Sequence, residues 1–209
     1  MSSTTRPYVV AHLAVSLDGA TTGFAPAVGR FYELARTWRE DVTLAGADTI
    51  LAQERALRAA PRAGPAPHGP LLAVVDGKGR VREWEALRDV GHWSGVLALH
   101  AAATPPRPGR AVPELVVGEE RVDLAAALGG LAREHGAGVV RVDSGGRLVG
   151  ALLAAGLLDE VSLLVHPLIA GMPGHRAWHG DTGAVGGVLA LVGNETLEDG
   201  LVWLRYRRG

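Results

Sequence analysis

The sequence predicts an α/β fold in which a central, mostly parallel sheet is covered by helices on both faces. Short apolar runs without a helical period recur along the chain, and amphipathic or capped helices lie between several of them. The last run, 200–208, alternates apolar and polar residues, which indicates a half-exposed strand that we expect to be antiparallel and at the sheet edge. The strands expected before it are 8–15, 42–46, 71–75, 95–99, 114–118, 138–142 and the apolar run 161–169.

Helices are expected between several of these runs. The segment 28–40 is predicted to be amphipathic, because it places Phe31, Leu34, Ala35 and Trp38 at helical spacing. Capping residues and terminal glycines indicate three more helices. Their expected limits are a start at Asp48 or Thr49, a helix from Asp123 to near Gly136, and a helix over 148–155 that stops at Gly156.

The chain is expected to form a single domain over 1–209. The Pro- and Gly-rich stretch 58–70 is interpreted as a long surface loop rather than a linker, because short strands continue on both sides of it. With 47% hydrophobic and 21% charged residues, the composition is that of a globular protein. A formal net charge of −1 without a basic stripe disfavours a nucleic-acid partner.

The chain has no cysteine, which rules out disulfides, zinc–thiolate sites and thiol nucleophiles. The first apolar run is interrupted by His12 and Ser16 and is too short and too polar for a signal segment or a membrane span. We therefore expect a soluble cytoplasmic protein that has a small-molecule substrate and no membrane partner.

Two strand-to-helix turns have the pattern of an anion site. In "VDSGG", 142–146, two glycines precede a helix, so backbone N–H groups at the helix start are open to a phosphate and the helix dipole favours it. A tight turn against a close neighbour explains the same glycines equally well. The turn 46–49 offers Thr49, which is either a phosphate contact or an ordinary N-cap. Two such turns on one sheet fit a dinucleotide.

Polar residues near these turns are candidates for chemistry. Asp18 in the "SLDG" turn is either a proton donor or substrate anchor, or simply an Asx-turn residue. Asp143 is suited to bind sugar hydroxyls or to move a proton. His166 is expected to satisfy a backbone group. His175 and His179 have HxxxH spacing, but the glycines and proline around them disfavour a helix, so no metal site is expected.

Four segments, in chain order, resemble the riboflavin-pathway pyrimidine reductases, which have the dihydrofolate-reductase-like fold. They are "AVSLDG" at 14–19, "GADTI" at 46–50, the block 140–171 and "GLVWLRY" at 200–206. The block is especially similar to the stand-alone diaminopyrimidine ribosylamine phosphate reductases. The resemblance implies an NADPH-dependent reductase with a mixed sheet flanked by helices, usually a homodimer. It also implies the reaction, in which hydride passes to C1′ of a ring-opened, imine-like sugar and converts a ribosylamino to a ribitylamino group.

The resemblance also implies roles for individual residues. Asp18 and Asp143 are the expected catalytic carboxylates, and Asp143 stands where many relatives carry a glutamate. The expected substrate contacts are Ser16, Asp143, Arg55 and Arg58. The expected cofactor contacts are Ala14, Thr49, Gln53, Val117, Gly118, Ser144, Gly145, Gly146, Arg147 and Leu148.

One segment departs from the family pattern. After "GADTI" the family shows an acidic pair, a proline and "LTVR", whose arginine helps to hold the substrate, whereas this chain has "LAQERALRAAPR". Arg55 or Arg58 is expected to replace that arginine. The departure leaves two alternatives: a reductase of the same fold that acts on a pterin, dihydrofolate or a specialised metabolite, and a nucleotide-binding protein without turnover. The expected homodimer is also favoured by the apolar run 161–169 and the aromatic-bearing final strand.

Overall fold

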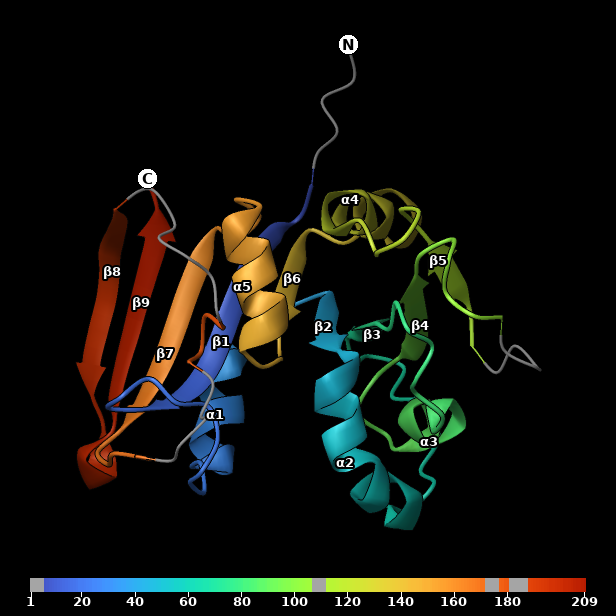
Figure 1. Cartoon of the computed structure of the whole chain (residues 1–209). Helices are drawn as coiled ribbons and strands as arrows, with labels where there is room; N and C mark the ends of the chain where they lie inside the picture. Colours follow the sequence, from blue (N-terminus) through green and yellow to red (C-terminus); the bar gives the residue numbers. More distant parts are fainter. Residues whose placement is uncertain (1–5, 107–111, 172–176, 181–187) are drawn as a thin grey trace. The chain divides into compact units, whose positions relative to one another are not determined.

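A computed structural model describes residues 6–106, 112–171, 177–180 and 188–209. Within these residues the chain forms nine strands and five α-helices (Figure 1), so the predicted α/β class is confirmed. The chain divides into two compact units, while the expectation of a single domain stays a prediction. Unit 1 consists of Met1–Pro7 and Glu40–Val140, and unit 2 consists of Tyr8–Arg39 and Arg141–Gly209.

Unit 1 is a parallel α/β arrangement. Its strands pair in the order β5-β4-β3-β2, and every pair is parallel. This agrees with the short, mostly apolar runs in the sequence, which are typical of parallel strands covered on both faces. The strands are β2 (Val42–Gly46), β3 (Leu71–Val75), β4 (Gly95–His100) and β5 (Glu114–Val116), and the helices are α2 (Ala47–Ala59), α3 (Trp84–Asp89) and α4 (Leu124–His135). Strand β6 (Val139–Val142) spans the division between the units.

In the core of unit 1, side chains at alternate positions of the strands pack against two helices. Ala45, Val74 and Ala98 are buried in one cluster with Ile50 of α2 and Leu87 of α3. None of the helices in the described part of the chain is long and apolar enough to cross a membrane.

Helix α4 has the ends that the sequence predicts. The Asp123 side chain accepts a hydrogen bond from the Ala126 N–H, and Gly136 closes the helix at a φ of 66°. That left-handed conformation favours glycine, which lacks a Cβ.

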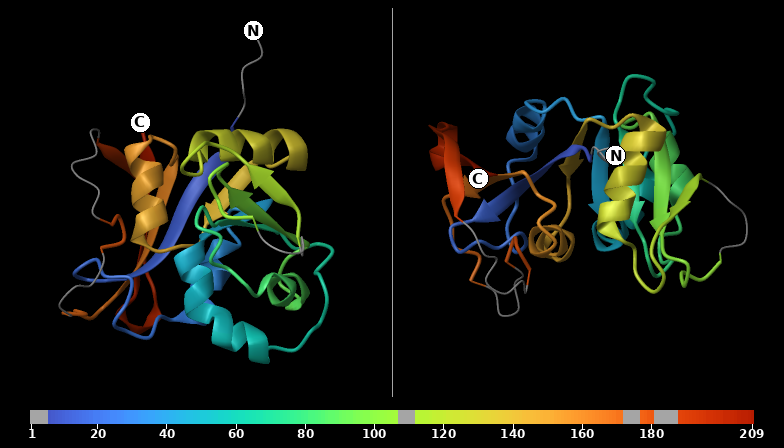
Figure 2. Two further views of the ribbon diagram at one scale, coloured as in Figure 1. Left: turned by 45° about the vertical axis from the view of Figure 1, so that its right-hand side comes forward. Right: turned by 90° about the horizontal axis from the view of Figure 1, so that it is seen from above.

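Unit 2 is a mixed sheet with one helix on each face. The strand order is β1-β7-β9-β8, in which β1 and β7 are parallel and the pairs with β9 are antiparallel. Helices α1 and α5 lie on opposite faces of β1 (Figure 2). The elements are β1 (Tyr8–Ser16), α1 (Val28–Ala35), α5 (Gly146–Ala154), β7 (Glu160–His166), β8 (Leu189–Thr196), a 3₁₀ turn (Glu198–Gly200) and β9 (Val202–Arg208).

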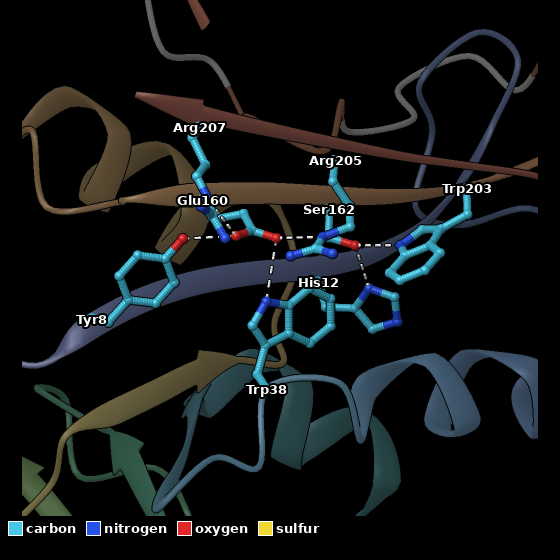
Figure 3. A network of polar contacts seen from close by, with 8 residues as sticks. All are labelled: Tyr8, His12, Trp38, Glu160, Ser162, Trp203, Arg205 and Arg207. Atoms are coloured by element: carbon cyan, nitrogen blue, oxygen red, sulfur yellow. Dashed lines mark hydrogen bonds and ion pairs between the residues drawn. The ribbon is translucent and has the colours of Figure 1, made fainter. Parts of the chain in front are cut away.

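A buried carboxylate holds together the α1 face of unit 2 (Figure 3). The Glu160 side chain is fully buried, and its Oε1 accepts hydrogen bonds from Arg205 Nε at 2.6 Å and Trp38 Nε1 at 3.2 Å. Its Oε2 accepts from Tyr8 Oη at 2.7 Å and Arg207 Nε at 3.0 Å. Burial raises the pKa of Glu160, but these donors outweigh it and hold the pKa below its usual value. One carboxylate therefore joins β1, β7, β9 and the segment after α1.

A second set of buried hydrogen bonds, around His12, fixes which ring nitrogen of its neutral imidazole carries the proton. His12 Nε2 lies 3.0 Å from the Phe31 carbonyl oxygen, which can only accept, so Nε2 carries the proton. His12 Nδ1 must then accept the hydrogen bond from Ser162 Oγ, at 2.9 Å. Ser162 Oγ in turn accepts from Trp203 Nε1 at 2.8 Å. The neutral imidazole thus fixes the backbone of α1 onto β1 and β7.

Helix α1 is shorter than the expected 28–40. The chain after Ala35 continues in three-residue turns, with Thr37 N–H donating to the Leu34 carbonyl and Trp38 N–H to the Ala35 carbonyl. Arg39 then takes a φ of 46°, which ends any helical course. Trp38 remains buried nevertheless, because its indole packs and bonds beside Glu160.

The predicted cap of α2 is wrong. The N-cap is Gly46, without a capping side chain, and both Asp48 and Thr49 lie inside the first turn. Asp48 instead pairs with Arg80 at 2.6 Å. Its negative charge near the helix N-terminus is favourable there without serving as a cap.

The final strand is antiparallel as predicted, but its edge position is wrong. Strand β9 lies between β7 and β8, so it is an inner strand of the order. Strand β8 lacks the usual apolar alternation because most of its residues are exposed and its register shifts between Leu191 and Gly193.

Candidate active site

Two turns of unit 2 contain site residues that were predicted from the sequence. One is the anchor turn, residues 16–20, which follows β1. The other is the β6–α5 turn, residues 143–146. Loops that follow parallel strands at their carboxyl ends are where α/β proteins usually build ligand sites.

The anchor turn is closed by Asp18. Ser16 is buried, and its Oγ donates to Asp18 Oδ1 at 2.5 Å and accepts from the Ala20 N–H at 2.9 Å. Asp18 also accepts from the backbone N–H groups of Ala170 at 3.0 Å and Gly171 at 3.1 Å. The Ser16 hydroxyl, followed by these two amides, holds the pKa of Asp18 well below its usual range. A carboxylate so stabilised holds no proton to donate near neutral pH.

The two glycines of the β6–α5 turn have different surroundings. A Cβ on Gly146 would lie 2.2 Å from the Ala177 carbonyl oxygen and 2.6 Å from the Gly180 nitrogen, so this position must be glycine for packing. Gly145 is exposed, and a Cβ there would meet no atom of the described residues within 4 Å. The tight-turn interpretation is therefore confirmed for Gly146, while the phosphate interpretation stays a prediction that Gly145 leaves room for.

The start of α5 fits a phosphate group of a nucleotide cofactor. Gly145 is the N-cap and has no side chain to satisfy the N–H groups of the first turn. Its open surroundings admit a phosphate oxygen to the backbone, and the exposed Arg147 adds positive charge nearby. Ser144 is half-buried, and Leu148 is buried in the core, so only the backbone of Leu148 is suited to such a contact.

Asp143 belongs to a polar cluster that sequence reasoning missed. Its Oδ2 accepts from Arg141 Nη1 at 3.2 Å and from Tyr32 Oη at 3.5 Å. The Arg141 side chain is 5% exposed and lies 6.0 Å from the centre of the Tyr32 ring. Burial, and then the charge of Asp143, raise the pKa of Tyr32 to about 12, so the phenol keeps its proton. An arginine inside the apolar strand 139–142 was the available signal.

The remaining unit 2 predictions concern Ala14 and the histidines. Ala14 is half-buried and packs against the core cluster beneath α1. His166 satisfies backbone groups as predicted, because its Nε2 accepts from the Ala27 N–H at 2.9 Å and its Nδ1 lies 3.1 Å from the Leu164 carbonyl. His175 lies outside the described residues. No group of three metal-binding side chains occurs within the ranges that the structure describes.

In unit 1 the expected cofactor residues follow β2 and β5. Thr49 is half-buried in the first turn of α2, and Gln53 is exposed one turn later. Val117 donates its N–H to the His100 carbonyl, directly after β5. Gly118 has a φ of 85°, and a Cβ there would lie 2.2 Å from the Arg121 carbonyl oxygen, so the turn requires glycine.

The expected substrate arginines lie on α2. Arg55 is exposed, and Arg58 is exposed and pairs with Glu83, its Nε 2.5 Å from Oε1. Serving as a substrate anchor would require Arg58 to exchange that partner for the ligand.

Comparison with known proteins agrees with the fold. A family model described as the RibD C-terminal domain matches residues 7–203. The 2,5-diamino-6-ribosylamino-4(3H)-pyrimidinone 5′-phosphate reductase of Methanothermobacter thermautotrophicus is 34% identical over 181 residues, which cover 79% of this chain and 80% of that protein.

Solved structures support the same fold. RibD of Acinetobacter baumannii superimposes with a TM-score of 0.72 at 19% identity, over 98% of this chain and 58% of that one, so this chain spans little more than half of that protein. The riboflavin biosynthesis reductase Rib7 of Saccharomyces cerevisiae has a TM-score of 0.68 at 17% identity, over 100% of this chain and 92% of that one. The family match over almost the whole length decides the assignment: the chain belongs to the RibD C-terminal domain family, with its dihydrofolate-reductase-like fold.

Proposed function

We propose that the protein is an NADPH-dependent reductase that converts a ribosylamino-pyrimidinone phosphate to its ribitylamino product. The observation that carries the proposal is the 34% identity, over 79% of the chain, to an archaeal protein named as the reductase of 2,5-diamino-6-ribosylamino-4(3H)-pyrimidinone 5′-phosphate. Family membership and the reductase-like fold support the same activity.

The open start of α5 supports the cofactor. NADPH, when bound, supplies the hydride for the reduction. The backbone of Gly145 and the first turn of α5 bind one of its phosphate groups, and Arg147 contributes positive charge. Thr49, Gln53, Val117 and Gly118 stay predictions as further contacts.

The Asp143 cluster is proposed as the substrate side of the site. Arg141 and Tyr32 both bond to Oδ2 of Asp143, and the side chain is 28% exposed, which leaves part of the carboxylate accessible to a sugar hydroxyl. Changing Asp143→Asn removes the charge and keeps the size, and we expect turnover to fall by about 10²–10⁴-fold with NADPH affinity unchanged. Tyr32→Phe, which removes only the phenol hydroxyl, is the matched control for loss of one hydrogen bond to Asp143. Native turnover in Asp143→Asn would move the chemistry elsewhere.

Steady-state oxidation of NADPH with the ribosylamino-pyrimidinone phosphate tests the activity. Turnover supports the proposal. Oxidation only with a pterin, dihydrofolate or another acceptor would instead support a same-fold reductase with a different substrate. NADPH binding with no acceptor at all would indicate a nucleotide-binding protein without turnover.

A homodimer is proposed as the assembly. The run 161–169, which first suggested it, is largely core, because Val161 and Leu164 are buried. Support comes instead from β8, the last strand in the order of unit 2, where Leu191 and Val192 are 51% and 44% exposed. Light scattering is expected to give a dimer for the native chain and a monomer for Leu191→Asp. A native monomer at micromolar concentration would contradict this. The cytoplasmic location stays a prediction.

A further inference from the structure

The anchor turn holds the chain after β7 at two separate places. At the first, Asp18 accepts the N–H groups of Ala170 and Gly171, at 3.0 and 3.1 Å. At the second, the Trp178 N–H donates to the Gly19 carbonyl at 3.0 Å, and Ala20 forms an antiparallel bridge with Ala177. A turn of five residues therefore fixes both positions.

Residues 177–180, here called the strap, lie directly on the first turn of α5. The Ala177 carbonyl oxygen and the Gly180 nitrogen occupy the space that a side chain at Gly146 would need. Contact is mutual, because a Cβ on Gly180 would lie 2.6 Å from the Gly146 carbonyl oxygen. Gly180 also has a φ of 64°, which other residues rarely adopt. The glycines at both positions are what allow the two backbones to touch.

Asp18 is the part of this arrangement that carries a charge. Its carboxylate organises the anchor turn through Ser16 Oγ and binds the chain at Ala170 and Gly171 through two charge-assisted hydrogen bonds. The backbone bonds at Gly19 and Ala20 are made by the same turn. If the turn loses its shape, the strap loses its support at the second place as well.

We propose that Asp18 is a positioning residue that seats the strap on the first turn of α5, and that it governs cofactor affinity there rather than the chemical step. The effect on cofactor affinity rests on the proposed function, since it takes the first turn of α5 as a phosphate site. The seating of the strap concerns the protein without any ligand and is tested separately.

Residue-resolved amide hydrogen exchange on the ligand-free protein tests the seating. In Asp18→Asn one oxygen is replaced by an amide nitrogen that cannot accept, and exchange at Ala170 and Gly171 is expected to rise about 10-fold or more. The decisive amide is Trp178, which bonds to Gly19 and not to Asp18. Its exchange should rise by a similar factor. An unchanged Trp178 amide would overturn the proposal.

The chain contains a matched control for this substitution. Asp41 in unit 1 also accepts two successive backbone N–H groups, those of Gly138 and Val139, at 2.8 and 2.9 Å. Asp41→Asn should speed exchange at those two amides and leave Trp178 unchanged. Faster exchange at Trp178 in this variant too would show general destabilisation and would overturn the assignment to Asp18.

Gly180→Ala tests the same contact from the strap itself. Its methyl group would lie against the Gly146 carbonyl, so Trp178 exchange should rise while the amides bound by Asp18 stay protected. Both variants should weaken NADPH about 10-fold in calorimetry, with kcat at saturation within about 3-fold of native. A kcat loss above about 100-fold in Asp18→Asn, with native NADPH affinity, would make Asp18 a catalytic residue instead. Failure of the native chain to bind NADPH would refute the proposed function, whereas the exchange data would still decide the seating.

Discussion

Protonation of His12 is expected to make the folded protein sensitive to mild acid. The imidazole is 1% exposed, stacks on Phe31 at 4.3 Å and bonds as the neutral form to the Phe31 carbonyl and to Ser162. Burial lowers the pKa of His12 from 6.5 to about 4, and the nearby positive charge of Arg141 adds to the effect. Between these two pH values the His12 imidazole is mostly protonated in the unfolded chain and mostly neutral in the folded chain. Stability therefore falls as the pH falls through this window.

The size of the effect follows from the two pKa values. Integrating the proton uptake between pH 7 and pH 5 gives a loss of about 2 kcal/mol, approaching about 3 kcal/mol at pH 4. Urea unfolding of the native chain and of His12→Gln at pH 7, 6 and 5 measures it. His12→Gln is expected to be less stable than the native chain at every pH, so the quantity to compare is how steeply the free energy of unfolding changes with pH. The carboxylates titrate in both proteins, so their contribution cancels in that comparison. Equal pH dependence of the two proteins would show that protonation of His12 does not cause the loss of stability.

Two further predictions concern Glu160 and the glycine turn. Glu160→Gln should lower the free energy of unfolding by about 2 kcal/mol at pH 7, as measured by urea unfolding. The reason is that Arg205 and Arg207 lose a buried anionic partner but keep some contact with water. A cost below about 0.5 kcal/mol would contradict this. Because the folded-state pKa of Glu160 is lowered, this contribution is present at neutral pH and disappears as the pH falls through that pKa. Gly145→Val should weaken NADPH about 10-fold in calorimetry with an unchanged melting temperature, whereas Gly146→Val should unfold more easily because its side chain meets the strap. Equal melting temperatures for the two valine variants would contradict the different surroundings of the two glycines.

The parts of the fold that sequence predicts are those determined by local chemistry. The apolar runs of β2 and β3 have the expected limits, because a fully buried parallel strand needs little beyond its own residues to be recognised. Helix α4 was predicted from Asp123 and Gly136, whose capping roles depend only on neighbouring backbone groups.

The misses in the site and in the sheet involve contacts between distant residues. Asp18 binds amides 152 and 153 positions away, and Tyr32 meets Asp143 across 111 positions, so no local pattern reports either pairing. Strand β8 was missed because it is mostly exposed and gains its hydrogen bonds from β9. The family resemblance predicts the same cofactor role for both glycines of the β6–α5 turn, and only the structure separates the open Gly145 from the packed Gly146.

The reaction proposed for this chain is the reduction of a ribosylamino-pyrimidinone phosphate by NADPH. The most direct measurement follows NADPH absorbance at 340 nm while mass spectrometry follows the pyrimidine, using 2,5-diamino-6-ribosylamino-4(3H)-pyrimidinone 5′-phosphate as the acceptor. We expect one NADPH to be oxidised for each ribitylamino product formed, a gain of two hydrogen atoms, and Asp143→Asn to abolish most of this turnover. A chain that binds NADPH and leaves this pyrimidine unreduced would rule out the proposed reductase activity.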